Sequence, residues 1–260
     1  MSLWTMKLLC IAPLCLALGL PGRGDARALP ADPLGSPMWE HHAAGLFGDA
    51  PVEFDSHVLV HVPQIAEDQR VFPVTVDARA IPEVARVVVL ADLNPIPVAV
   101  DYRLAAGAAF LATRIKLDQR TPVRAAVQTR DGTWHVGGSW VDAAGGGCSA
   151  PPASRVRGDW AEHLGEVRGA AWTDIDRDMV RLRMTFRHPM DTGLVENVPP
   201  YNIERLTIRD DAGKLLGEMD IFGSVAEDPA FTVMIESHGG AVRFVARDTA
   251  GLEFSGQTRP

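Results

Sequence analysis

Cys148 is the residue of this sequence whose type and surroundings most directly suggest chemistry. It follows Gly145, Gly146 and Gly147 and precedes Ser149. A cysteine thiolate is a nucleophile, and glycine lets the backbone bend freely and enter narrow spaces. We therefore expect an exposed thiol on a flexible carrier arm, with a pKa of about 8.5. Such a thiol is suited to holding a covalently bound group.

Two other interpretations of Cys148 remain open at this point. A thiol enzyme would need a histidine base within hydrogen-bonding distance of the thiol, and a glycine-flanked segment provides no fixed geometry for one. An incidental cysteine in a linker is the other, although free thiols are uncommon in exported proteins. We expect no catalytic residues and no enzymatic activity.

Residues 1–28 have the pattern of a secretory signal peptide. Lys7 precedes an apolar run from Leu8 to Leu20, and Ala26-Arg27-Ala28 offers small residues at a cleavage site. The apolar run is too short to span a bilayer as a helix. Cys10 and Cys15 lie within this run, so Cys148 is the only cysteine of the mature chain and has no partner for an intrachain disulfide. We expect a periplasmic protein, with an intermolecular disulfide through Cys148 as a possible route to a homodimer.

The rest of the chain predicts strands more than helices. Residues 36–47 have the pattern of a short helix that begins near Ser36 and Pro37. Short segments rich in β-branched residues follow, bounded by Gly, Pro, Asp or Asn. The predicted strands are 58–62, 71–76, 86–91, 98–104, 111–117, 123–129 and 133–141, then 179–186, 201–209, 215–221, 231–236, 242–247 and 252–255. Asp131-Gly132 predicts a hairpin turn between two of them.

The strand-rich segments are separated by a stretch rich in glycine and proline. We predict an all-β protein of two immunoglobulin-like β-sandwich domains with a short N-terminal helix. The predicted domains are 36–144 and 158–260, and residues 145–157 form the carrier arm and linker.

Two sets of short motifs occur in these two segments. The first set is Phe72 to Ala78, Val87 to Leu90, Asn94 to Pro97, Ala112 to Ile115 and Gly146 to Cys148. The second set is His188 to Gly193, Pro200 to Ile203 and Asp248 to Gly251. The first set resembles SoxY and the second resembles SoxZ, the sulfur-carrier proteins of bacterial thiosulfate oxidation. Together they cover most of the mature chain.

The resemblance implies two immunoglobulin-like domains, normally separate subunits, joined in one polypeptide. It also implies that intermediates are bound covalently to the sulfur of Cys148, with no cofactor. The implied partners are periplasmic sulfur-oxidising enzymes or c-type cytochromes. The fused form resembles the SoxYZ-like carriers associated with quinoprotein dehydrogenases, so an accessory protein that docks a periplasmic PQQ alcohol dehydrogenase is the alternative function.

Charge and the remaining motifs exclude several other functions. Lys and Arg number 25 against 33 Asp and Glu, for a net charge of −8, which disfavours binding to nucleic acid. His57 and His61 share a face of one predicted strand, but strand histidines that face solvent are ordinary. We interpret His135 and the His41-His42 pair in the same way, and we expect no metal site. His188 is expected in a loop at the domain interface.

Overall fold

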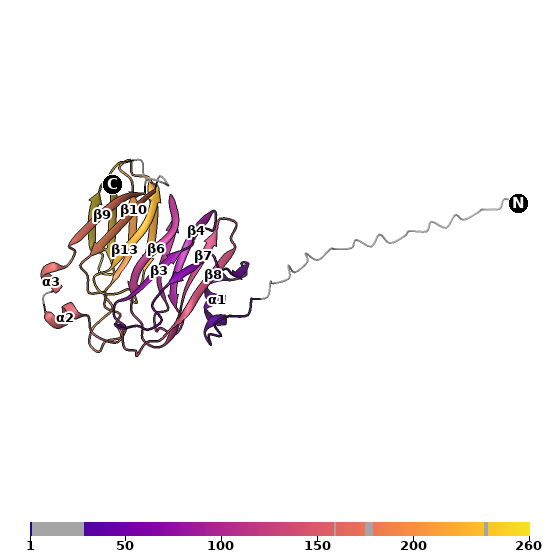
Figure 1. The fold of residues 1–260 in the computed structure, drawn as a ribbon, viewed down its shortest axis with the longest axis horizontal. Coiled ribbons are helices and arrows are strands. Elements are labelled where there is room, and N and C mark those ends of the chain that lie inside the picture. The colour runs from indigo at the N-terminus through magenta and orange to yellow at the C-terminus, as the bar shows by residue number, and fades with distance from the viewer. Residues whose placement is uncertain (2–28, 159, 175–178, 237–238) are drawn as a thin grey trace.

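Two β-sheets build the protein. The structure is a computed structural model that describes residues 1, 29–158, 160–174, 179–236 and 239–260. The predicted signal peptide, apart from Met1, lies outside the described residues. The described part is mostly β-structure, as predicted, and forms a sandwich-like fold (Figure 1).

The described strands fall into a nine-stranded and a six-stranded sheet. The order in the larger sheet is β1-β8-β7-β4-β5-β12-β11-β14-β15, and in the smaller it is β2-β3-β6-β13-β10-β9. The strands before residue 145 are β1 (Val52–Phe54), β2 (Leu59–His61), β3 (Phe72–Asp77), β4 (Val84–Ala91), β5 (Val98–Leu104), β6 (Gly107–Ile115), β7 (Thr121–Thr129) and β8 (Trp134–Val141). Those after it are β9 (Val167–Asp174), β10 (Met179–Phe186), β11 (Ile203–Arg209), β12 (Leu215–Ile221), β13 (Ala230–Glu236), β14 (Val242–Asp248) and β15 (Glu253–Thr258).

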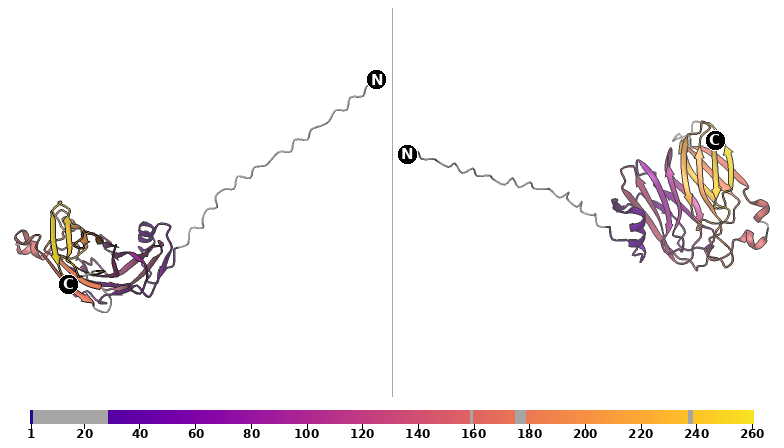
Figure 2. Two further views of the ribbon diagram at one scale, coloured as in Figure 1. Left: turned by 90° about the horizontal axis from the view of Figure 1, so that it is seen from above. Right: turned by 180° about the vertical axis from the view of Figure 1, so that it is seen from behind.

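Both sheets continue from the N-terminal half of the chain into the C-terminal half. In the larger sheet β5 pairs antiparallel with β12, and in the smaller sheet β6 pairs antiparallel with β13. Seen from behind in Figure 2, the strands of the two halves accordingly lie side by side. Buried apolar residues of both halves form one continuous core, from Phe72 to Phe244 and beyond. The two halves are thus joined edge to edge by main-chain hydrogen bonds as well as by the chain itself.

The alternation of apolar and polar residues explains most of the strands. In β14 every second residue is buried, from Val242 to Asp248, which is the period of a strand with one face on the core. The hairpin predicted at Asp131-Gly132 is present between β7 and β8, and Gly132 has the positive φ of 92° that the turn requires. Every predicted strand is found, whereas β1 and β9 were not predicted.

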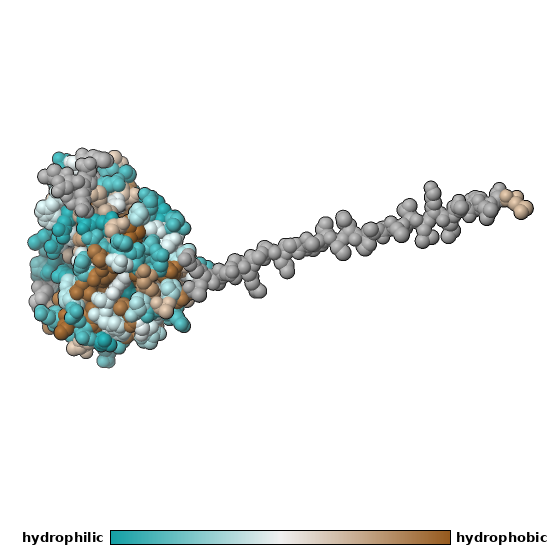
Figure 3. All heavy atoms as spheres, turned by 45° about the vertical axis from the view of Figure 1, so that its right-hand side comes forward, coloured by the Kyte–Doolittle hydropathy of each residue, from teal (hydrophilic) through white to brown (hydrophobic). Residues whose placement is uncertain are grey.

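The described residues form three short helices, which lie at opposite ends of the molecule. The predicted N-terminal helix is α1 (Trp39–Phe47), which packs through Trp39 and Phe47 on the larger sheet beside β8 (Figure 1). Helices α2 (Ala153–Arg157) and α3 (Trp160–His163) lie at the other end, beyond β9. None of the helices in the described part of the chain is long and apolar enough to cross a bilayer. On the face in Figure 3, hydrophobic residues lie in groups among hydrophilic ones.

Candidate functional site

The glycine-rich segment that carries Cys148 is docked against the loop that follows β6. Gly146 N donates a hydrogen bond to Asp118 O (3.3 Å), and Gly147 N donates one to Leu117 O (3.0 Å). Leu117 N in turn donates to Gln69 O (2.8 Å). The segment is therefore held by regular main-chain hydrogen bonds, and it does not extend from the surface as a free arm.

Two glycines of this segment are required by close packing. A Cβ atom on Gly147 would lie 2.3 Å from Gln69 O and 2.4 Å from Leu117 O. Gly145 has a φ of 105°, and a Cβ atom there would lie 2.7 Å from Asp118 O. The lack of side chains at these glycines permits tight docking. From the sequence alone, the same glycines were expected to make the segment flexible.

Cys148 is fully buried between the two halves of the chain. Its N–H donates to Asp118 Oδ1 (3.2 Å), and its carbonyl oxygen accepts a hydrogen bond from Thr192 Oγ1 (2.7 Å). Ser149 Oγ donates to the same Asp118 oxygen (3.2 Å). The expectation of an exposed thiol is therefore wrong for this structure. The reason is that Thr192, which is 44 residues further along the chain, closes over a segment already docked through its glycines.

Burial changes the acidity of the Cys148 thiol. Desolvation disfavours the thiolate and raises its pKa to about 12, and the negative charge of Asp118 acts in the same direction. The ammonium group of Lys116 opposes both effects without overcoming them. The expected pKa of about 8.5 is also wrong for the docked segment. In this conformation the thiol is protonated at neutral pH and is a poor nucleophile.

Lys116 is a functional candidate that the sequence analysis missed. It is buried, and its Nζ donates hydrogen bonds to Met190 O and to Gly223 O (2.8 Å) in the C-terminal half. Desolvation lowers its pKa to about 8, whereas the neighbouring Cys148 and Asp191 favour the charged form. One signal for Lys116 was present in the sequence, because lysine is rare in this chain. Of the 25 Lys and Arg residues, three are lysine, at Lys7, Lys116 and Lys214.

A cavity of about 100 Å³, partly open to solvent, borders the docked segment. Its lining includes Lys116, Gly147, Pro152 and Glu227. The segment is thus packed on one side by the β6–β7 loop and faces open space on another. Its departure from the docked position would break a limited set of contacts.

The remainder of the predicted linker is also ordered. Ala153 N and Ser154 N, in the first turn of α2, donate to the carboxylate of Glu227 (2.6 and 2.7 Å). Arg155 forms an ion pair with the buried Asp191, and its guanidinium lies 3.9 Å from the ring centroid of Trp160. The expectation of an irregular linker over 145–157 is corrected accordingly, because these contacts fold its second part into a helical turn.

His188 lies in the loop that follows β10, as expected, and its side chain is buried. Its Nδ1 accepts a hydrogen bond from Met190 N (3.1 Å), and its Nε2 lies 3.6 Å from Asp248 Oδ2. Tyr201 Oη donates to the same Asp248 oxygen (2.8 Å). Desolvation lowers the pKa of His188 to about 4, although Asp248 favours its charged form. Among the described residues, no histidine forms a hydrogen bond with Cys148, so the geometry of a thiol enzyme is not found there.

The comparisons with known proteins agree with the two halves of this architecture. Residues 43–148 match the family described as sulfur oxidation protein SoxY, and residues 172–259 match sulphur oxidation protein SoxZ. The chain joins a SoxY domain to a SoxZ domain. The SoxY match ends at Cys148, the residue on which the sequence analysis placed the carried group.

Solved structures give weaker likenesses. The sulfur carrier protein SoxY from Chlorobium limicola f thiosulfatophilum is 20% identical, with a TM-score of 0.34 over 41% of this chain and 96% of its own. The BSP domain of a biofilm associated protein is 10% identical, with a TM-score of 0.25 over 77% of this chain and 28% of its own. No curated protein matches the chain. The association with quinoprotein dehydrogenases stays a prediction.

Proposed function

We propose that this fused SoxYZ-like protein carries a sulfur-containing group covalently on Cys148 and presents it to enzymes of sulfur oxidation. The observation that carries the proposal is the SoxY match, which ends at Cys148. Outside the predicted signal peptide the chain has no other cysteine that could hold the group. The protein acts as a carrier and not as a catalyst, and the predicted signal peptide supports a periplasmic location for this work.

The buried thiol implies two states of the carrier segment. In the docked state the thiol is protonated and buried, and hydrogen bonds between the Cys148 main chain and the side chains of Asp118 and Thr192 hold the segment in place. Burial protects the thiol from oxidation and from disulfide formation with other proteins. When the segment undocks, the thiol becomes accessible and its pKa returns towards about 8.5. Loading therefore requires undocking, which a partner enzyme stabilises by binding the released segment.

The chemistry of loading identifies what a partner must supply. If the Cys148 sulfur is joined to the outer sulfur of a thiosulfate-type donor, an S–S bond forms, the thiol loses its proton and two electrons are released. An electron acceptor must take these two electrons. A c-type cytochrome, one of the partners that the resemblance implies, can fill this role if two haem irons each take one electron, or if one haem iron is reoxidised between two one-electron steps.

Mass spectrometry of the intact protein from its own periplasm tests the proposal. During sulfur oxidation we expect a bare mass together with masses raised by sulfur or sulfonate groups, all of which revert to the bare mass with dithiothreitol unless oxidised beyond sulfenic acid. The Cys148→Ser variant should carry no adduct. The double variant with Cys148→Ser and Ser149→Cys moves the thiol by one residue and serves as the control for the position of the thiol. Native protein without any adduct under these conditions would overturn the proposal.

A docking accessory of a quinoprotein dehydrogenase is the second candidate. The observation in its favour is the burial of Cys148, which suits a residue that has no reaction to perform. In that case the protein from alcohol-grown cells should co-purify with the dehydrogenase, and Cys148→Ser should leave both the complex and alcohol oxidation unchanged. Loss of alcohol oxidation in the Cys148→Ser variant would instead favour the carrier function.

A further inference from the structure

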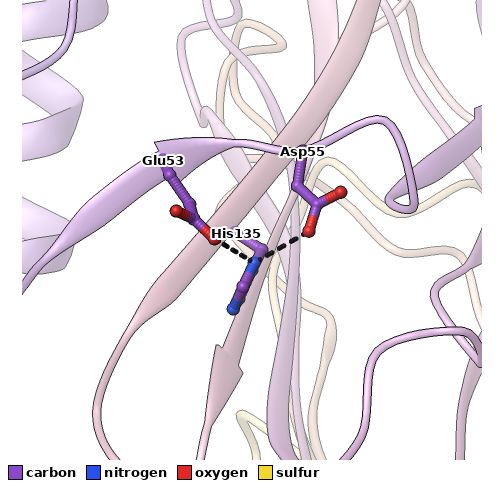
Figure 4. Close-up of side chains that lie close together, drawn as sticks. All are labelled: Glu53, Asp55 and His135. Atoms are coloured by element: carbon purple, nitrogen blue, oxygen red, sulfur yellow. Dashed lines mark hydrogen bonds and ion pairs between the residues drawn. The ribbon is translucent and has the colours of Figure 1, made fainter.

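Three potential metal ligands meet at the edge of the larger sheet, in the N-terminal half. Strand β1 pairs in parallel with β8 so that Glu53 lies opposite His135. Glu53 and Asp55 are two residues apart, so their side chains lie on the same face. His135 Nδ1 lies 3.0 Å from Glu53 Oε1 and 3.0 Å from Asp55 Oδ2, as Figure 4 shows.

The spacing of these atoms fits a single metal ion. Zinc binds histidine nitrogen and carboxylate oxygen at about 2.0–2.2 Å, which separates neighbouring ligand atoms by about 3.3 Å in a tetrahedron and about 3.0 Å in an octahedron. The three ligand atoms of Glu53, Asp55 and His135 all lie within 4.8 Å of one another. An ion can therefore contact all three after only small movements.

The cluster is also supported from outside. Asp55 Oδ1 accepts hydrogen bonds from the N–H and from Nδ1 of His57, both at 2.8 Å, which holds the other carboxylate oxygen towards His135. Hydrogen bonds of this kind orient the ligands in established metal sites. The carboxylate of Asp131 interacts electrostatically with His135 and adds negative charge. Within the described ranges, neither Glu53 nor Asp55 forms an ion pair with a lysine or arginine.

We propose that Glu53, Asp55 and His135 bind a divalent transition-metal ion of the Zn²⁺ class. One imidazole with two carboxylates is a mixed nitrogen and oxygen set, which suits Zn²⁺ better than the all-oxygen set preferred by Mg²⁺ or Ca²⁺. Binding requires the His135 tautomer with its proton on Nε2, so that the lone pair on Nδ1 faces the ion. A water molecule completes the coordination.

The site is separate from the carrier segment. His135 lies near the start of β8, whereas the segment with Cys148 follows the end of that strand. An ion at this position would fasten the three-residue edge strand β1 to β8. Metal binding at this site does not depend on the carrier function, so either of these two proposals can fail without the other.

Titration calorimetry of the untagged mature protein, without the predicted signal peptide, with ZnCl₂ tests the site. We expect one bound ion per chain and at least a tenfold weaker affinity in Glu53→Gln, Asp55→Asn and His135→Gln. His163→Gln is the matched control, because His163 Nδ1 contacts one carboxylate, that of Glu166 (2.7 Å), without a third ligand. This control should bind zinc like the unchanged protein.

Cobalt gives a second readout that does not rely on affinity. Co²⁺ bound at the site should give visible absorption bands that His135→Gln abolishes, and far-UV circular dichroism should show that this variant remains folded. Absence of zinc binding would overturn the proposal and identify the cluster as an ion pair only. Metal binding that survives His135→Gln but is lost in His41→Gln would also overturn the proposal. The ion would then be bound by His41 and His42, which follow each other in the sequence.

Discussion

At the scale of single residues, buried titratable groups determine how the protein responds to pH. Cys148 and His188 both lose solvation on folding, and both are driven towards their neutral forms. For the thiol this means low reactivity while it is docked. For the imidazole it means that folding and proton uptake compete, and this competition can be measured.

We predict that acid destabilises the protein through His188. Its pKa is about 4 in the folded protein and about 6.5 in an unfolded chain. Above pH 6.5 neither state binds the proton, whereas between pH 6.5 and pH 4 the unfolded state binds it preferentially, so stability falls as the pH falls through this window. The contribution is on the order of 3 kcal/mol.

Urea unfolding between pH 7 and pH 4.5 measures this effect. His188→Gln keeps a polar group of similar size but cannot take up the proton, so its free energy of unfolding should vary less over this window. Equal pH dependence in the two proteins would contradict this prediction, because it would mean that the pKa of His188 is the same in the folded and the unfolded protein.

At the scale of elements, the docked segment over residues 145–149 controls access to the thiol. Its position depends on the space left by Gly147, where a methyl group would meet two carbonyl oxygens at 2.3 and 2.4 Å. Overpacking of this kind costs about 1–3 kcal/mol. A larger side chain should therefore expose Cys148 in the free protein.

We predict that Gly147→Ala increases the rate of Cys148 alkylation. The lost docking energy corresponds to an increase of about 5- to 150-fold in the undocked fraction, and iodoacetamide labelling followed by intact-mass analysis gives the rate. Gly45→Ala in α1 is the control, because no atom lies within 4 Å of the added Cβ. If the unchanged protein already reacts as fast as a free thiol, the segment is not docked in solution.

The strands were more predictable than the state of this segment. The alternation of buried and more exposed residues in β10 and β14 is local, because burial of one strand face is encoded in the order of apolar and polar residues. β9 was missed because Gly169, Ala170 and Ala171 have low strand propensity, and β1 was missed because three residues give no clear period. The burial of Cys148 depends on Thr192 and on Leu117, and contacts between such distant positions leave no local pattern. For the same reason the proximity of Glu53 to His135 was not predicted.

At the scale of the whole molecule, the two halves act as one folding unit. The β5–β12 and β6–β13 pairings continue both sheets across the junction. Arg103 and Asp220 form an ion pair across it (2.9 Å), and the buried Lys116 ammonium donates to two carbonyl oxygens of the other half. These contacts do not require an intact linker.

We predict that the halves stay together after the linker is cut. A protease recognition sequence inserted after Ala150 allows cleavage of the folded protein, and gel filtration at micromolar concentration should then elute both fragments together. Buried apolar surface and the strand pairings hold them, because their separation would expose two sheet edges to water. Elution as two separate species would show that the covalent link is needed to hold the halves together.

The two anchors of the carrier segment limit how far Cys148 can travel. Asp142 is fixed by main-chain hydrogen bonds with Gln64 and Ala66, and Ala153 is fixed by Glu227. Residues 143–152 form an arch between these points, and ten extended residues reach at most about 17 Å outward and back. An arch cannot be threaded through a pore that admits one strand. For the proposed carrier function, a receiving enzyme must therefore present an open slot, wide enough for two chains and no deeper than this reach.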